Sequence, residues 1–260
     1  MSLSSSSSRS RSSSSSSASC WLTAIPLEQH GFTLHKSAFR DALCLRYGWH
    51  PSNLPDICPC GSKFSVDHSL SCPTGGYPSI RHNEVRDLFT NLLTEVCHDV
   101  HKEPVLQPLN GEVFQKRCTT SDENARLDIA VSGFWGGHFQ RTFFDVRVFN
   151  PNASSYKSVQ IPSLYKRQEQ EKKRRYEERI NNVELSSFTP IILACTGGCS
   201  KLTSIFLKRR LRITSLVCFW FHHDPQRFYS VGDRKSLSTV NRDLNFKSLL
   251  FCSASSLSTP

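Results

Sequence analysis

The sequence predicts a mixed α/β fold, a small central sheet with flanking helices, preceded by a zinc-binding module. Three observations lead to this prediction: an amphipathic helix pattern, two apolar strand patterns that each contain an aspartate, and a group of cysteines and a histidine before them. The predicted divisions are a disordered Ser/Arg tract (1–25), a leading helix with the zinc module (26–78), the α/β domain (79–200) and an irregular basic tail (201–260).

The composition favours a nucleic-acid partner. The chain has 260 residues, a formal net charge of +10 and 38% hydrophobic residues, so we expect one core with disordered ends. A basic excess of this size points to DNA or RNA rather than to a surface that is basic only for solubility. No secretory signal and no apolar run of membrane-spanning length is visible, so we expect a nuclear or else cytoplasmic chain with no membrane partner. The 11 cysteines are then thiols or metal ligands.

The middle of the chain shows alternating helix and strand patterns. The predicted order is helix, two or three strands, helix and strand, over Ser79 to about Val100, Arg126–Ser132, Thr142–Asn150, Ser163–Glu184 and Pro190–Ala194. The glycine-rich segment Gly133–Gly137 is expected to join the two central strands as a hairpin. These elements together predict a mixed sheet with helices packed on it.

Four candidate metal ligands lie before the first of these helices. Cys58, Cys60, His68 and Cys72 form the pattern C-x-C-x7-H-x3-C. Zinc takes four sulfur or nitrogen ligands in a tetrahedron, and His68 and Cys72 are spaced so that one helical turn presents both. The sequence therefore predicts a structural zinc site, with buried free thiols and an incidental histidine as the alternative.

Two aspartates interrupt the predicted central strands. Asp128 and Asp145 stand among apolar residues, where a charge is costly unless it is paired or binds a metal. Both could hold one Mg²⁺, with Glu84 completing the group from the preceding helix. Arg147 or Lys172 would then hold the phosphate or the attacking water. The alternative is a structural ion pair between Asp145 and Arg147, and histidines such as His82 are interpreted as ordinary surface residues.

The helix predicted after the second strand is rich in basic residues. It offers a candidate nucleic-acid-binding face made of Lys166, Arg167, Lys173, Arg174 and Arg175. Such contacts would follow the phosphate backbone without reading sequence. The alternative is a solvent-exposed helix with ion pairs between successive turns.

The order of these motifs resembles the C-terminal part of site-specific, early-branching non-LTR retrotransposon polyproteins. The similar residues are the Cys-Cys-His-Cys group, then Arg81-His82-Asn83, then Leu127-Asp128-Ile129 and Phe144-Asp145-Val146-Arg147. In that family the zinc motif precedes a restriction-endonuclease-like domain of the PD-(D/E)XK class with an αβββαβ core. The resemblance covers roughly 31–198 and implies that 79–200 is an endonuclease domain cutting DNA with catalytic Mg²⁺, in a chain that lacks the reverse transcriptase region. The segment 31–46 is similar to the helix that leads into the family's zinc motif.

The sequence departs from the family pattern at two positions. Leu127 replaces the proline, and Arg147 stands where the motif has lysine. The resemblance places the missing lysine on the following helix, at Lys172, with Lys166 and Lys173 as alternatives. Because a guanidinium cannot act as a base, the alternative functions are an inactive zinc-dependent nucleic-acid-binding module and a decayed or truncated mobile-element fragment.

Overall fold

A computed structural model gives the structure of the chain. It describes residues 36–208 except 48, 53, 75, 76, 136, 138 and 196, and except the side chains of 37, 38, 42, 45 and 46. The predictions of a disordered start and of an irregular basic tail beyond residue 208 lie outside the described residues. The described elements, in chain order, are α1 (Lys36–Tyr47), α2 (Val66–Ser69), α3 (Tyr77–Thr94), β1 (His98–Lys102), β2 (Ile129–Ser132), β3 (Arg141–Phe149), the 3-10 turn η4 (Ser154–Tyr156), α4 (Ile161–Asn182), β4 (Ser187–Ala194) and α5 (Lys201–Phe206).

Four strands form one mixed sheet in the order β1-β2-β3-β4. The first two pairings are antiparallel, and β3 pairs with β4 in parallel along its length. A parallel neighbour requires a crossover, and α4 supplies it. The sequence prediction of a mixed α/β fold with a central sheet is therefore confirmed, as is the order helix, strands, helix, strand.

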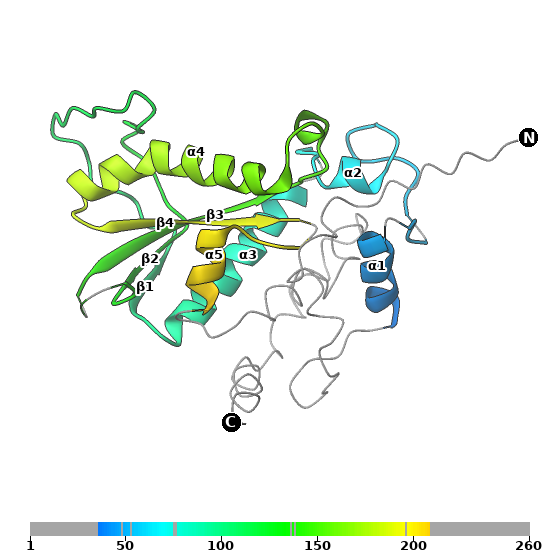
Figure 1. Cartoon of the computed structure of the whole chain (residues 1–260), viewed down its shortest axis with the longest axis horizontal. Helices are drawn as coiled ribbons and strands as arrows, with labels where there is room; N and C mark the ends of the chain where they lie inside the picture. The colour runs from blue at the N-terminus through cyan, green and yellow to red at the C-terminus, as the bar shows by residue number, and fades with distance from the viewer. Residues whose placement is uncertain are drawn as a thin grey trace, which may run out of the picture.

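Helices cover both faces of the sheet (Figure 1). On one face α3 and α5 pack against a core that includes Phe89, Phe144, Ile191 and Phe206. On the other face α4 contributes Leu164, Tyr176 and Ile180 to two further clusters. The alternation of β3 decides which side chains face α4, and its α4-facing set contains Phe143, Asp145 and Phe149.

The predicted end of the helix from Ser79 to about Val100 was wrong. The helix α3 begins at Tyr77 and ends at Thr94, and β1 begins at His98, where the prediction had helix up to Val100. Val96, placed on the buried row, is 44% exposed. Pairing of His101 with Ala130 of β2 gives this segment sheet hydrogen bonds, which outweigh its apolar spacing.

The second strand is shorter than predicted. It spans Ile129–Ser132 rather than Arg126–Ser132, and Leu127 packs with Ala130 and Tyr176 on the α4 side instead of sharing a face with Ile129. The hairpin after it is confirmed: Gly133 has a φ of 83°, and its N–H donates to the carbonyl of Gln140. At the other end of the core, α5 adds Phe206 to the main cluster, beyond the predicted boundary at residue 200.

None of the helices in the described part of the chain combines the length and the apolar character needed to cross a membrane.

Candidate functional site

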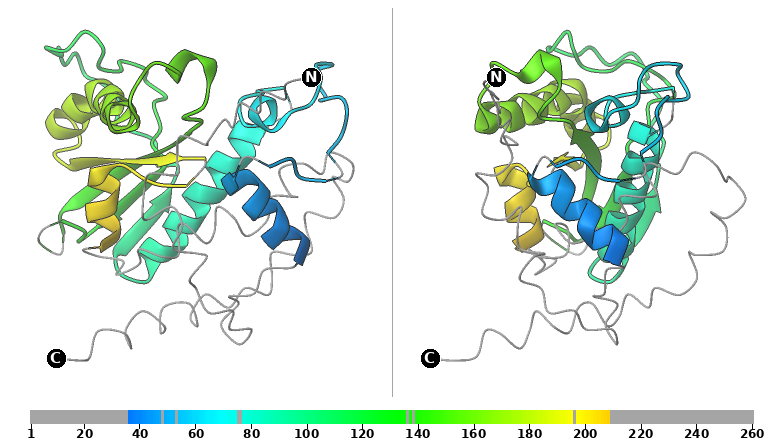
Figure 2. Two further views of the ribbon diagram at one scale, coloured as in Figure 1. Left: turned by 45° about the vertical axis from the view of Figure 1, so that its right-hand side comes forward. Right: turned by 90° about the vertical axis from the view of Figure 1, so that its right-hand side faces the viewer.

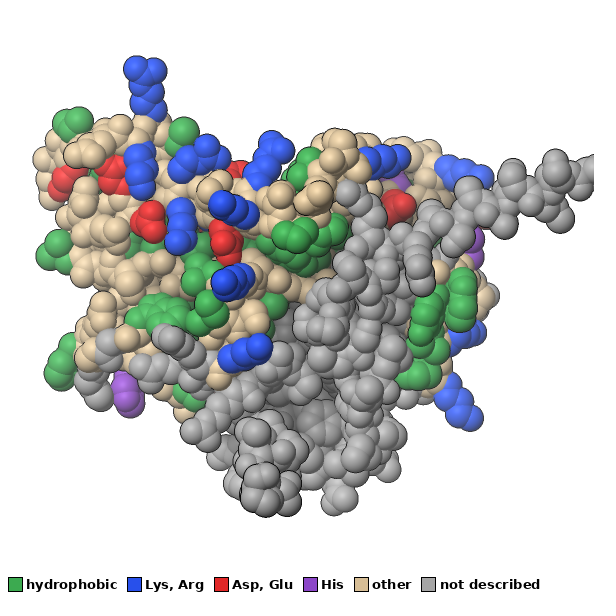
Figure 3. Space-filling model, viewed as in Figure 1, with side chains coloured by type: hydrophobic (Ala, Val, Ile, Leu, Met, Phe, Trp, Pro, Cys, Tyr) green, Lys and Arg blue, Asp and Glu red, His purple; other side chains and the backbone are tan. Residues whose placement is uncertain are grey.

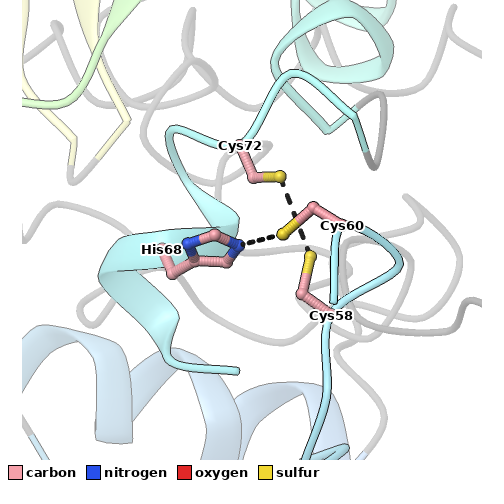
Figure 4. A group of neighbouring side chains, drawn as sticks. All are labelled: Cys58, Cys60, His68 and Cys72. Atoms are coloured by element: carbon pink, nitrogen blue, oxygen red, sulfur yellow. Dashed lines mark hydrogen bonds between the residues drawn. The ribbon is translucent and has the colours of Figure 1, made fainter. Parts of the chain in front are cut away.

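The four predicted zinc ligands lie together beside the N-terminal end of α3 (Figures 2 and 4). Cys58 and Cys60 lie on a tight turn in which the Gly61 N–H donates to the carbonyl of Cys58 and Gly61 has a φ of 83°. His68 lies on α2, a short helix whose N-terminus is capped by the Ser65 hydroxyl accepting from the His68 N–H. Cys72 follows one turn later.

The spacing of the ligand atoms fits a tetrahedral ion. The four donor atoms lie within 4.8 Å of one another, and the sulfurs of Cys58 and Cys72 are 3.8 Å apart. Two sulfurs that each bind one zinc at about 2.3 Å are separated by about 3.8 Å along a tetrahedral edge. The Nε2 of His68 lies 3.1 Å from the sulfur of Cys60, so the second pair also faces the same point. The residues therefore fit zinc in number, in chemistry and in spacing.

The thiol of Cys60 is prepared to act as a thiolate ligand. Hydrogen bonds from the side chain and then the backbone of Ser62 lower the pKa of Cys60 to about 6. A lowered pKa favours metal binding because the ligand is the thiolate.

A second group of polar residues lies between the sheet and α4. Ile129 of β2 pairs with Phe144 of β3. Asp128 and Asp145 are the next residues beyond that pair, so both lie at the same end of the antiparallel β2–β3 ladder. One oxygen of Asp128, Oδ2, accepts the N–H of Val146 at 2.6 Å, which fixes this carboxylate against β3. Both carboxylates raise the pKa of Tyr176 on α4 in addition to the effect of burial.

Lys172 on α4 pairs with Asp145. Its Nζ lies 2.5 Å from Oδ2 of Asp145, and it also lies over the ring of Tyr176, 5.8 Å from the centroid. Position 172 faces inward because it continues the row that contains Leu164, Gln168 and Tyr176. The structure thus places Lys172, and not Lys166 or Lys173, against Asp145.

The carboxyl group of Asp145 has an unusual pKa. Burial raises it to about 6; the positive charge of Lys172 opposes this shift and the negative charge of Asp128 adds to it. Because Asp128 accepts the N–H of Val146, the residue next to Asp145, two like charges lie near each other at this end of the β2–β3 ladder. Such an arrangement is costly without a cation, and it is typical of carboxylates that share one.

His82 is a residue of this group that sequence reasoning missed. Its Nε2 lies 3.0 Å from Oδ1 of Asp128, and its charge also lowers the pKa of Asp145. The available signal was helical position, because His82 lies three and seven residues before the buried Val85 and Phe89.

Glu84 does not lie as close to Asp128 and Asp145 as predicted. It lies on α3 and is half-buried. In the described part of the chain the group of Cys58, Cys60, His68 and Cys72 is the one set of three or more His, Cys, Asp or Glu donors mutually within 4.8 Å. Glu84 therefore does not form such a group with Asp128 and Asp145.

Arg147 turns away from the acidic pair. Its guanidinium donates to Glu171 on α4 at 2.7 Å, which favours neither the predicted ion pair with Asp145 nor a direct role beside it. Burial acts to raise the pKa of Glu171, but the hydrogen bond and charge of Arg147 outweigh it and the pKa is lowered.

The outer face of α4 carries the predicted basic residues. Lys166, Arg167, Arg174 and Arg175 are exposed, and Lys173 is half-buried and 3.9 Å from Glu177. Lys and Arg side chains are spaced along this face with acidic side chains among them (Figure 3). The exposed basic residues are compatible with a phosphate-binding face, and the pair of Lys173 and Glu177 is compatible with a helix that carries ion pairs between its turns.

No protein-family model and no curated protein matches the chain.

Proposed function

We propose that this chain is a metal-dependent DNA endonuclease of the restriction-endonuclease-like class, derived from a site-specific non-LTR retrotransposon. The observation that carries the proposal is that Lys172 on α4 pairs with Asp145 on β3, while Asp128, just before β2, accepts the N–H of Val146, the residue next to Asp145. Two carboxylates, one just before β2 and one on β3, and a lysine on a helix are the groups that phosphodiester hydrolysis with a divalent cation requires.

Further support comes from the order of the elements. From α3 to β4 the order is helix, three strands, helix, strand, which is the αβββαβ order that the sequence resemblance implies. The Cys-Cys-His-Cys group precedes it, as in that family. The zinc would be structural, and the Mg²⁺ would be catalytic.

Each residue has a distinct task in this mechanism. Asp128 and Asp145 would hold the cation, and Asp128 is already oriented by the N–H of Val146. The chemistry that such an ion supplies is positive charge at the scissile phosphate and a lower pKa for the attacking water. Lys172 would leave Asp145 to hold that water or a phosphate oxygen, and the exposed basic residues of α4 would bind the flanking DNA backbone.

The test is nicking of supercoiled plasmid by the zinc-loaded chain in Mg²⁺. We expect the wild type to nick, and Asp145→Asn and Lys172→Met each to lose at least about 100-fold in rate. Asp99→Asn on β1 and Lys157→Met, at an exposed lysine before α4, are controls that should stay within about twofold of wild type. Equal nicking by wild type and Asp145→Asn would refute the proposal.

A second function is favoured by one specific observation. Arg147 is paired with Glu171, Asp145 with Lys172 and Asp128 with the imidazole of His82, which suits an inactive site. The chain would then be a zinc-dependent nucleic-acid-binding module. It would bind DNA with the same affinity as its Asp145→Asn variant, and neither protein would nick the plasmid.

A further inference from the structure

A turn in the long segment between β1 and β2 lies against the C-terminal half of α4 (Figure 1). The N–H of Thr119 donates to the carbonyl of Lys116 at 2.9 Å and closes this turn, in which Arg117 is a central residue. The next N–H, that of Thr120, donates to the carbonyl of Arg175 on α4, also at 2.9 Å. Arg117 is therefore held beside the part of the helix that carries basic residues.

The carboxylate of Glu178 on α4 fixes the turn in place. It accepts the N–H of Gln115 at 2.6 Å, the N–H of Lys116 at 2.9 Å and the hydroxyl of Thr119 at 2.9 Å. The buried Arg179 next to it holds three carbonyls of the same segment. Because donors and acceptors of the segment are both held by α4, the turn has its conformation before any ligand binds, which lowers the entropic cost of binding.

Three arginines at this place carry positive charge that no acidic partner offsets. Arg117, Arg174 and Arg175 are exposed, and none of their guanidinium groups forms an ion pair with a residue in the described part of the chain. The two acidic residues that follow them on α4 are engaged elsewhere, Glu178 with the turn and Glu177 with two lysines. Unpaired guanidinium groups on neighbouring elements suit phosphate, which they bind through charge-assisted hydrogen bonds.

The arginines lie next to the proposed cleavage site. The guanidinium carbon of Arg175 is 5.3 Å from the centroid of the Tyr176 ring, and Nζ of Lys172 is 5.8 Å from the same centroid. We infer that Arg117, Arg174 and Arg175 form one surface that binds the phosphates of duplex DNA beside the scissile one, with the turn as a second wall next to α4. The inference rests on the proposed function, because it specifies how that function's substrate is held.

Binding of DNA tests the surface without relying on cleavage. Fluorescence anisotropy of a labelled duplex is measured with the full zinc-loaded chain, in buffer without Mg²⁺, at several salt concentrations. We expect Arg117→Gln to reduce the slope of log affinity against log salt by about 1, and the triple replacement of all three arginines by glutamine to reduce it by about 3. Arg117→Lys keeps the charge and should keep the slope. Lys201→Gln, an exposed change on α5 across the sheet, should also leave it unchanged.

Two acidic neighbours give predictions of opposite sign. Loss of a negative charge from a DNA-binding face strengthens binding if electrostatics alone acts, and we expect this for Glu177→Ala. Because Glu178 fixes the turn, Glu178→Ala should instead weaken binding by about threefold or more. An unchanged slope in Arg117→Gln, or tighter binding in Glu178→Ala as in Glu177→Ala, would overturn the inference. A melting curve of each variant checks folding.

The two proposals fail in different ways. If the wild type nicks plasmid and Arg117→Gln keeps the slope of the wild type, only the inferred surface is refuted. If the slopes change as expected and no variant nicks, the endonuclease proposal falls and the surface stands. A wild type that binds no duplex would refute both.

Discussion

At the residue scale, the buried ion pair of Asp145 and Lys172 is energetically costly, and this cost points to a functional site. A carboxylate in an apolar strand loses its hydration, and a second carboxylate beside it adds repulsion. Lys172 offsets part of this cost at 2.5 Å, yet the pKa of Asp145 stays raised at about 6. A fold maintained for stability alone would gain by replacing the pair with apolar residues, which is why the pair suggests a function.

The raised pKa of Asp145 leads to a pH-dependent stability difference. The carboxyl is more easily protonated in the folded chain than in the unfolded chain, so its favourable contribution is present at low pH and is lost as pH rises through about 6. In buffer free of divalent cations other than zinc, Asp145→Asn should therefore gain about 1 kcal/mol of unfolding free energy relative to wild type between pH 5.5 and pH 8. Urea denaturation at both pH values measures this; a difference that does not change with pH would contradict it.

The same scale shows which site residues the sequence could predict. Asp128 and Asp145 were recognisable because a charge stands out in a strand of apolar residues, and Lys172 because it lies on the inward row of its helix. His82 was not, because a histidine in a first helical turn is common on surfaces. Its role depends on a contact across 46 residues of sequence, which only the folded chain reveals.

At the scale of elements, α4 combines a packed row with a clamp on the segment that precedes β2. Arg179 is fully buried and donates to the carbonyls of Gln107, Thr120 and Asp122. A buried guanidinium that holds three carbonyls fixes that segment to α4, since carbonyls buried without donors are costly.

Replacement of Arg179 should therefore release this segment. We expect Arg179→Met to cost about 3 kcal/mol of unfolding free energy and to make residues 107–122 sensitive to limited proteolysis. The exposed neighbour Arg174→Met should change stability by less than about 0.5 kcal/mol. Denaturation curves and the mapped cleavage sites give both results, and equal stability of the two variants would exclude the clamp.

The outer face of the same helix gives a prediction about salt. If Lys166 and Arg167 contact DNA phosphates, their double replacement by glutamine should reduce the slope of log affinity against log salt by about 2. Fluorescence anisotropy with a duplex at several salt concentrations measures the slope. An unchanged slope would leave these residues as a solvated helix face.

Elements with strong periodicity were predictable, and those defined by partners were not. The helix α4 and the strand β3 lie within two residues of their predicted bounds, because their patterns continue over many residues. The strand β4, predicted over Pro190–Ala194, begins three residues earlier, at Ser187. The strand β1 was missed because His98–Lys102 has little apolar character, and it is a strand only through its pairing with β2. The fold class thus followed from the sequence, whereas the end of α3 depended on tertiary contacts.

At the scale of the whole molecule, the group of Cys58, Cys60, His68 and Cys72 is attached to the α/β core through α3. Tyr77, the first residue of α3, packs with Cys58 and Cys72. One helical turn later the buried Arg81 donates to the carbonyl of Leu70 at 3.2 Å. Because His82 follows Arg81 directly, the same turn of helix connects the zinc cluster with the acidic pair.

Loss of zinc should therefore destabilise the α/β core as well as the segment that carries the four metal ligands. We expect one zinc per chain by elemental analysis, and Cys72→Ser or a chelator should lower the melting temperature by about 10 °C, as a loss of a few kcal/mol does in a chain of this size. Cys118→Ser, at an exposed cysteine, should retain the zinc and the melting temperature. Zinc-free protein with an unchanged melting temperature would contradict a structural role.

The central claim, that Asp128 and Asp145 share one cation, is tested most directly by crystals of the chain soaked in Mn²⁺. Anomalous diffraction collected between the manganese and zinc absorption edges distinguishes this site from the zinc cluster. We predict one manganese peak within about 2.3 Å of a carboxylate oxygen of both aspartates. A map in which manganese contacts neither residue, or only one of them, would contradict the account.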